Sequence, residues 1–136
     1  MKYNLFLTLT CLIISNRPAF CQSAMAYYQL GHEQRLKGQY TTAIDYFNQA
    51  IEMDSNLTPA LEGKGYCHAN LKNYEEALRA FDKAVTLGSQ DPLLFLNRGW
   101  ALYNVGQKAE ACQNWQMCEQ LGYEKVQETL EKYCRK

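Results

Sequence analysis

Small and large apolar residues recur with a period of 34 along most of the chain. Glycine stands at positions 31, 65 and 99, and four further columns keep their size and polarity at the same period: Tyr27, Leu61 and Phe95; Ala43, Ala77 and Ala111; Phe47, Phe81 and Trp115; Ala50, Ala84 and Cys118. Within each unit, apolar positions recur every three or four residues on both sides of a short polar break, which is the helical period. Each unit is therefore predicted to be a hairpin of two helices.

Turn and cap residues divide these hairpins. The predicted breaks inside them are Lys37–Gln39, Lys72–Asn73 and Gly106–Lys108. Between units, Ser89 or Asp91 can cap the next helix, and Pro92 suits its first turn because the missing N–H would be unpaired there anyway. Thr58-Pro59 is predicted to open the second unit in the same manner.

These residues resemble the tetratricopeptide repeat family, whose repeat has the same period. The likeness covers about Ala24 to Gly122, and the segments most similar to the family's second helix with its turn are Gly38–Ile51 and Asn73–Val85. It implies an all-α fold, a right-handed α-solenoid of three helix-turn-helix repeats at 24–57, 58–91 and 92–122. The third copy departs most, with Lys108 in place of tyrosine and Cys118 in place of alanine.

Two long cations, Lys64 and Arg98, replace the aliphatic residue that the family has and that Leu30 supplies in the first copy. Their stems can cover apolar surface while the charges reach water. After the third copy, residues 123–136 are predicted to form a capping helix, with Val126, Leu130 and Tyr133 on one apolar stripe. Such a helix covers the apolar end that a solenoid otherwise exposes.

The segment 1–21 has the composition of a secretory signal. Lys2 gives a positive start, and the apolar run from Leu5 to Ile14 is too short to span a bilayer. The sequence Ala19-Phe20-Cys21 fits cleavage before Gln22; the alternative is an uncleaved N-terminal helix. We expect an exported protein, periplasmic or secreted from a bacterial envelope, whose mature chain does not span a membrane.

Length and charge narrow the function. A chain of 136 residues is enough for one domain, and its formal net charge of zero gives no electrostatic footprint for nucleic acid. Cleavage of the signal would leave 12 basic against 14 acidic residues. No nucleophile–base constellation and no phosphate-binding glycine loop is present, so we expect no enzyme and no cofactor.

Of the four cysteines after the signal, two are predicted to pair. Cys112 and Cys134 lie equally far along the sequence on either side of a turn near Tyr123, so an antiparallel arrangement brings them side by side. A disulfide is the prediction, and unpaired thiols are the alternative. Cys67 and Cys118 are interpreted as small buried hydrophobes. A metal is not expected, because there is no Cys-x-x-Cys and Leu36 stands where a His-Glu-x-x-His motif needs its second histidine.

The resemblance implies a peptide-binding groove lined by the first helix of each hairpin. The residues that map to it, beside Met25, are Tyr28, His32, Arg35, Glu62, Tyr66, Asn70, Leu96, Trp100, Tyr103 and Asn104. Asn70 and Asn104 could pair with a peptide backbone; alternatively, the aromatic residues only pack between helices. The family's clamp for C-terminal carboxylates is not expected, because Tyr28, His32, Gly63, Leu93 and Asn97 stand at its positions.

Two classes of function remain. The first is a non-catalytic module that binds a protein or peptide partner through the groove. The second is a structural or assembly component of an envelope complex that acts through the solenoid ends or through self-association.

Overall fold

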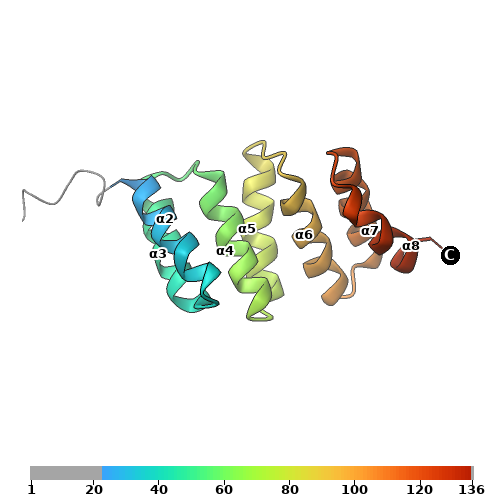
Figure 1. Cartoon of the computed structure of the whole chain (residues 1–136), viewed down its shortest axis with the longest axis horizontal. Coiled ribbons are helices and arrows are strands. Elements are labelled where there is room, and N and C mark those ends of the chain that lie inside the picture. The colour runs from blue at the N-terminus through green and yellow to red at the C-terminus, as the bar shows by residue number, and fades with distance from the viewer. Residues whose placement is uncertain (1–22, 136) are drawn as a thin grey trace, which may run out of the picture.

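The computed structural model describes residues 23–135, and every regular element in that range is a helix (Figure 1). The elements are α2 (Ala24–Leu36), α3 (Tyr40–Met53), α4 (Thr58–Asn70), α5 (Tyr74–Thr86), α6 (Pro92–Asn104), α7 (Lys108–Gln120), the 3₁₀ turn η2 (Glu124–Val126) and α8 (Gln127–Tyr133). Three hairpins follow one another in a row from α2 to α7, which confirms the all-α solenoid. The predicted signal, residues 1–21, lies outside the described residues.

The repeated glycines let aromatic rings pack directly on a neighbouring helix backbone. A Cβ atom added at the glycine would meet a ring of the second helix in the same hairpin, at 2.8 Å for Gly31 and Phe47 and at 2.6 Å for Gly65 and Phe81. The approach of Trp115 to Gly99 is closer still. All three rings are fully buried. The columns of the repeat are therefore the crossing points of the two helices in each hairpin.

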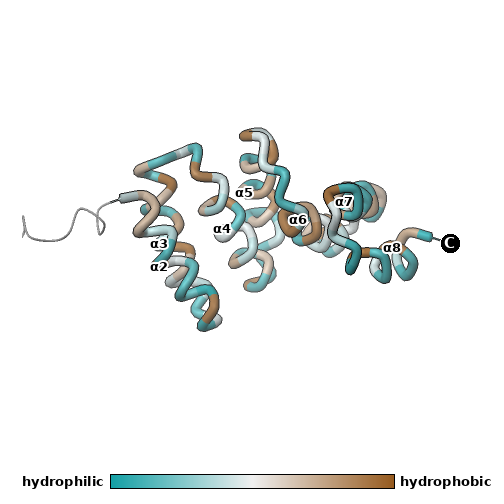
Figure 2. The backbone as a smooth tube through the Cα atoms, turned by 45° about the horizontal axis from the view of Figure 1, so that its top comes forward, coloured by the Kyte–Doolittle hydropathy of each residue, from teal (hydrophilic) through white to brown (hydrophobic). Residues whose placement is uncertain are grey.

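The first helices of the hairpins form a continuous inner layer. Helix α2 packs against α4, and α4 against α6, whereas α3, α5 and α7 are not packed on one another to a comparable extent. The array therefore curves with α2, α4 and α6 on its inner side. Figure 2 shows hydrophobic and hydrophilic stretches alternating along the helices, as expected where only part of each helix is covered.

The turn inside each hairpin contains one residue with a left-handed backbone. Gly38 (φ 73°) and Gly106 (φ 90°) occupy this position in the first and third hairpins, and Lys72 (φ 62°) occupies it in the second. The N–H of Asn73 donates to the carbonyl oxygen of His68 at 2.9 Å, which ties off the end of α4. In the middle hairpin, a residue with a side chain, Lys72, therefore occupies a turn position for which glycine is better suited.

Helix α6 begins with the cap that the sequence predicts, but α4 does not. The Asp91 carboxylate accepts a hydrogen bond from the N–H of Leu93 at 2.9 Å, and Pro92 follows in the first turn. Ser89 instead donates its hydroxyl proton to Glu62. In the second unit, Pro59 lies in the first turn of α4 as predicted. Thr58 does not cap the helix, because it is already helical and the cap position holds Leu57, whose side chain has no acceptor.

Arg98 is bound on both sides of α6. Its Nη2 lies 2.7 Å from Oδ1 of Asp82 on α5, and its Nη1 donates to Oδ1 of Asn114 on α7 at 2.8 Å. The side-chain amide of Asn114, which is buried, donates in turn to the carbonyl oxygen of Glu110. The guanidinium thus joins the second and third hairpins, which the sequence did not predict, while the side chain stays 25% exposed to water.

The terminal segment is not one continuous helix. Gly122 (φ 94°) ends α7, the turn η2 follows, and α8 has only 7 residues. The turn η2 directs Val126 into the core, where it is fully buried, and Leu130 follows it there. The segment packs against α7, as a capping element does.

Candidate functional site

The inner surface carries a first hollow between α2, α4 and the start of α6. Its volume is about 380 Å³, within the range of ligand sites. Five of the predicted groove residues line it: Tyr28, His32, Arg35, Glu62 and Tyr66. Gly63 lines it as well, and a Cβ atom there would lie 2.5 Å from Cζ of Phe47. The buried ring of Phe47 thus occupies the space that a side chain at position 63 would need.

The charges of this first hollow come from different helices. On α2, Nη2 of Arg35 lies 3.3 Å from Nδ1 of His32, and the guanidinium carbon lies 4.9 Å from the centre of the Tyr66 ring. Between α4 and α6, the half-buried Glu62 accepts a hydrogen bond from Ser89 at 2.5 Å. Burial raises the pKa of Glu62 above its ordinary value; the Ser89 bond opposes this, and the nearby Asp91 carboxylate adds to the rise.

A second hollow of about 290 Å³ lies between α4 and α6. The predicted residues that line it are Tyr66, Asn70, Trp100 and Asn104. The amide nitrogens of Asn70 and Asn104 donate to carbonyl oxygens one turn earlier in their own helices, those of Tyr66 and Trp100, at 2.8 Å each. Each side chain keeps its oxygen to accept a peptide N–H and its second amide N–H to donate to a peptide carbonyl.

Leu96 and Tyr103 line neither hollow and pack into the C-terminal core. The carbonyl oxygen of Leu96 accepts the indole N–H of Trp115 at 3.2 Å. Tyr103 lies with its ring centre 5.9 Å from that of Trp115 and 5.2 Å from that of Tyr133. Both residues therefore contribute to packing at the C-terminal end. Met25 lies outside both hollows too, with a side chain that is 45% exposed.

Both interpretations, groove lining and packing between helices, apply to Trp100. It lines the second hollow, and its ring centre lies 4.9 Å from that of Trp115 and 5.4 Å from that of Tyr133. The half-buried indole is thus both part of the groove surface and part of the C-terminal core. Its truncation would disturb packing as well as the surface.

The structure adds residues that the groove mapping missed. Asn97 lines both hollows, Leu93 and Asp91 line the first, and Tyr74 lines the second. A periodic signal could have found Asn97, because it lies one repeat period after Gly63, and both stand among the positions of the carboxylate clamp. Tyr66 and Asn97 belong to both hollows, so the two form one furrow across the three first helices.

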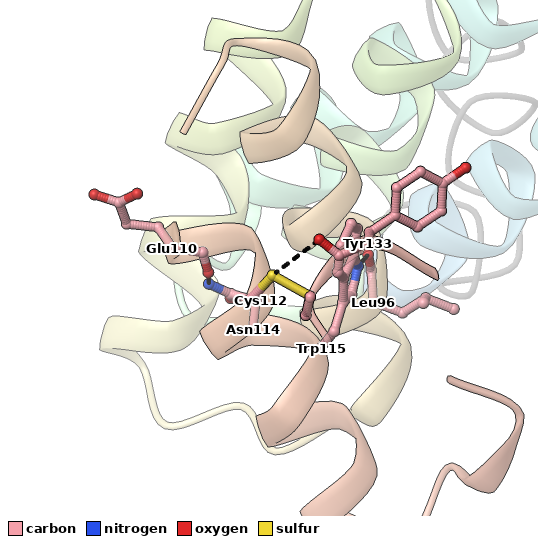
Figure 3. Close-up of a disulfide and its surroundings, with 7 residues drawn as sticks. Leu96, Glu110, Cys112, Asn114, Trp115 and Tyr133 are labelled. Carbon is pink, nitrogen blue, oxygen red and sulfur yellow. Dashed lines mark hydrogen bonds between the residues drawn. A yellow bond between two sulfur atoms is a disulfide. The ribbon is translucent and has the colours of Figure 1, made fainter. Parts of the chain in front are cut away.

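A disulfide fastens the end of the array beside this furrow. The predicted bond between Cys112 and Cys134 is present, with Cα atoms 5.7 Å apart, and joins α7 to the end of α8 (Figure 3). Its Cys112 sulfur lies 4.0 Å from the carbonyl oxygen of Tyr133. The bond thus holds Tyr133 against Trp100 and Trp115, whose ring centres are 5.4 and 5.9 Å away.

The two remaining cysteines of the described residues are free and buried, in agreement with their interpretation as core residues. Burial raises the pKa of both the Cys67 and the Cys118 thiol to about 11. Both are therefore protonated and unreactive at neutral pH.

Within residues 23–135, no cluster of three or more histidine, cysteine, aspartate or glutamate residues is arranged to hold a metal ion. In the same range, no helix is both long and apolar enough to cross a membrane. The expected absence of an enzymatic activity, a cofactor, a metal or a nucleic-acid partner stays a prediction.

The fold and the furrow define an array of stacked helical hairpins with a lined inner face. The family model described as tetratricopeptide repeat matches residues 24–92, about half of the chain. The chain therefore belongs to the tetratricopeptide repeat family.

Known proteins share parts of this array. The BBSome complex member BBS4 of Bos taurus is 32% identical over 92 residues, 68% of this chain but only 18% of that protein. The chain thus spans less than a fifth of that relative's length. The crystal structure of YrrB, described as a TPR protein with an unusual peptide-binding site, is 25% identical with a TM-score of 0.71, over 83% of this chain and 56% of that one.

A further structure shows the fold with a ligand. The type III secretion chaperone SycD of Yersinia enterocolitica, in complex with a peptide of the translocator YopD, superposes with a TM-score of 0.74 at 19% identity. The match covers 80% of this chain and 90% of SycD. At this identity the likeness concerns the fold alone.

Proposed function

We propose that this protein binds peptide segments of partner proteins in the furrow along α2, α4 and α6. The observation that carries the proposal is that two hollows share Tyr66 and Asn97, which gives a continuous surface across three hairpins. An extended chain can follow such a surface and place successive side chains in the two hollows. SycD, which shares the fold, has been solved with a peptide bound.

The lining suits a peptide better than a small substrate. Tyr66 and Trp100 offer rigid apolar area, and the tyrosine hydroxyl adds a polar tip, a composition typical of binding hot spots. The side-chain oxygens of Asn70 and Asn104 lie along the same wall and can accept peptide N–H groups. We further propose that the module is non-catalytic, because within residues 23–135 the one hydroxyl bonded to a lining carboxylate, that of Ser89 on Glu62, lines neither hollow.

We also propose that the protein is exported and acts in the periplasm or outside the cell. Residues 1–21 have the charge, apolar run and small residues of a secretory signal. The Cys112–Cys134 disulfide supports this location, because such bonds persist in oxidising compartments and are rare in the cytosol.

Tyr66→Ala tests the furrow, with Tyr46→Ala as its matched control. Both tyrosines are half-buried, but Tyr66 is shared by the two hollows and Tyr46 lies on α3, outside them. Peptides would be selected on the full chain from a phage-displayed library of random dodecamers. We expect the Kd of selected peptides to rise about tenfold or more in Tyr66→Ala and to stay within about twofold in Tyr46→Ala.

Far-ultraviolet circular dichroism shows whether both variants keep their helices. Equal losses of affinity in two folded variants would contradict binding in the furrow. Failure to select any peptide that binds the wild-type chain would contradict peptide binding itself.

A second candidate, assembly through an end of the solenoid, is favoured by the exposed apolar surface of α2. Leu36 is 70% exposed and, with Tyr28 and His32, borders a shallow hollow of about 320 Å³ at this end. Sedimentation velocity over a range of concentrations tests it. Association that Leu36→Ser abolishes supports assembly, and a monomer at all concentrations excludes self-association.

A further inference from the structure

The first hollow is lined by one cation, Arg35, which already contacts other protein groups. It is also lined by two carboxylates, those of Glu62 and Asp91, which form no ion pair within residues 23–135. The Arg35 guanidinium is stacked over Tyr66 and lies beside His32. Glu62 and Asp91 line the same hollow from α4 and from the start of α6. In residues 23–135, ion pairs involve other acids, namely Glu33, Glu76, Asp82 and Glu131.

The hydrogen bonds of these two carboxylates leave acceptor capacity. Glu62 accepts the Ser89 hydroxyl, and Asp91 accepts the N–H of Leu93. A carboxylate can accept about four hydrogen bonds, so each keeps room for an ammonium or guanidinium donor. Glu62 lies on α4 and Asp91 is the cap residue of α6. The two are close enough for Asp91 to raise the pKa of Glu62 both by its charge and by a hydrogen bond between the side chains.

We propose that the first hollow accepts a lysine or arginine side chain of the bound peptide, whose charge pairs with Glu62 and Asp91. This inference rests on the proposed function and names the chemistry of the partner at one position. The apolar stem of such a side chain lies along Tyr28 and Leu93, the latter 44% exposed, while its charged end reaches the carboxylates.

Position 63 restricts this subsite to the first hollow. Gly63 lets the Phe47 ring lie under the hollow without a side chain above it. One repeat later, Asn97 fills the corresponding place, and Leu96 stands where Glu62 stands in the second repeat. The second hollow therefore lacks both the open position and the acid.

The electrostatics of the first hollow support a cationic ligand. The pKa of Glu62 is raised, chiefly by burial, so its charge is unfavourable where it stands and a ligand cation relieves this cost. The other charged or titratable groups that line the hollow are Tyr28, His32 and Arg35 on α2, Tyr66 on α4, and Asp91 at the cap of α6. Ion pairs of partly buried groups with good hydrogen bonds contribute more than exposed pairs.

Three pools of synthetic peptides test the proposal on the full chain. Each pool contains acetylated, amidated heptamers with flanks randomised over Ala, Leu, Tyr and Asn. The central residue is lysine, norleucine, which has no charge, or glutamate. We expect the lysine pool to bind about tenfold more tightly than the norleucine pool, and the glutamate pool to bind most weakly. The preference for lysine should shrink as salt rises.

The variant Glu62→Gln/Asp91→Asn should bind the lysine and norleucine pools about equally tightly. Glutamine keeps an acceptor for Ser89, and asparagine caps a helix as well as aspartate does. The control Asp45→Asn/Glu52→Gln makes the same change in net charge at exposed positions of α3 that line neither hollow, and should keep the preference.

Equal binding of the lysine and norleucine pools to the wild-type chain would overturn the cationic subsite while leaving peptide binding intact. A lysine preference that survives in Glu62→Gln/Asp91→Asn would also overturn it. If no pool binds, both this inference and the proposed function fail.

Discussion

The two ends of the furrow use the same repeat for different purposes. In the first hollow, Glu62 and Gly63 leave an open, acidic surface, whereas the equivalent positions one repeat later hold Leu96 and Asn97. The second hollow is bordered instead by Trp100, which the C-terminal aromatic core supports from behind. The comparison teaches that side chains replaced within a fixed column change the chemistry of a site without changing the helices that carry it.

The two ends also differ in how they are stabilised. The C-terminal end has an aromatic cluster around the fully buried Trp115, a covalent bond and a capping segment. The N-terminal end has apolar side chains in solvent, Leu36 among them, and the first hollow beside it has a partly buried carboxylate, that of Glu62 on α4. We expect substitutions at the C-terminal end to change stability most, and substitutions at the N-terminal end to change binding most.

The largest effect is expected at Trp115, which is fully buried and joins α6 to the aromatic cluster. Trp115→Ala should lower the free energy of unfolding by about 3–5 kcal/mol, measured by urea denaturation. Trp115→Phe keeps a ring but removes the hydrogen bond to the Leu96 carbonyl, and should cost less. A loss below about 1 kcal/mol for Trp115→Ala would contradict the assignment of this end as the stable one.

Removal of the disulfide is expected to have the next largest effect. Cys112→Ser/Cys134→Ser should lower the free energy of unfolding by about 3 kcal/mol, because the bond restricts the unfolded chain over a separation of 22 residues. Dithiothreitol should destabilise the wild-type protein and leave the double variant unchanged. Faster hydrogen exchange should be confined to η2 and α8, and its spread to α2 would contradict a local role.

Gly63→Ala addresses the floor of the first hollow. A methyl group there would lie 2.5 Å from the Phe47 ring, which is buried and cannot move freely. We expect a loss of about 1–3 kcal/mol in unfolding free energy and weaker peptide binding. Asn97→Ala, in the equivalent position of the second hollow, should change stability far less. Equal losses of stability in Gly63→Ala and Asn97→Ala would contradict this difference between the two hollows.

Lys72→Gly should stabilise the protein, because glycine adopts the left-handed turn backbone without the steric cost that lysine bears at φ 62°. The expected gain is about 0.5–1 kcal/mol in unfolding free energy. Lys72→Ala is the control, since alanine keeps the cost. The middle hairpin borders both hollows, so the gain in stability should leave the difference between the two hollows unchanged. A loss of stability in Lys72→Gly would contradict the inference that the backbone of Lys72 is strained.

The smallest effect is expected for Glu62→Gln, and it depends on pH. Because the pKa of Glu62 is raised in the folded protein, its stabilising contribution is present below the ordinary carboxyl pKa and is lost as pH rises through the folded value. Glutamine should therefore stabilise the fold at pH 7 by roughly 0.5 kcal/mol or less, with no gain at pH 3. Urea denaturation at the two pH values measures this, and a loss at pH 7 would contradict the sign.

Most of the architecture could be predicted because it depends on residues repeated three times. The glycine column that begins at Gly31 and the aromatic column that begins at Phe47 can be recognised from their period alone. In the structure the two columns meet where the helices of each hairpin cross. The Cys112–Cys134 pairing followed from symmetry about a turn near Tyr123. The left-handed turn at Lys72 escaped notice, because a lysine carries no sign of the backbone it adopts.

The furrow was harder to predict, since it depends on which side of a helix packs and which stays open. Leu96 and Tyr103 share columns with groove residues, yet the capping segment and Trp115 draw them into the core. The structure near the chain end differs because no fourth hairpin follows it within the described residues. Asn97 could have been found only by asking which residue lies one period after Gly63.

In a linear array, each hairpin is stabilised by its neighbours, so the two end units are the first to detach. Within residues 23–135, a covalent bond strengthens the C-terminal unit by tying the capping segment to α7, and no such bond strengthens α2 and α3. Disassembly of the array should therefore proceed in one direction, beginning with α2 and α3. The hairpin that carries His32 and Arg35 would be lost first, so the acidic half of the furrow would lose its opposite wall before the aromatic half is affected.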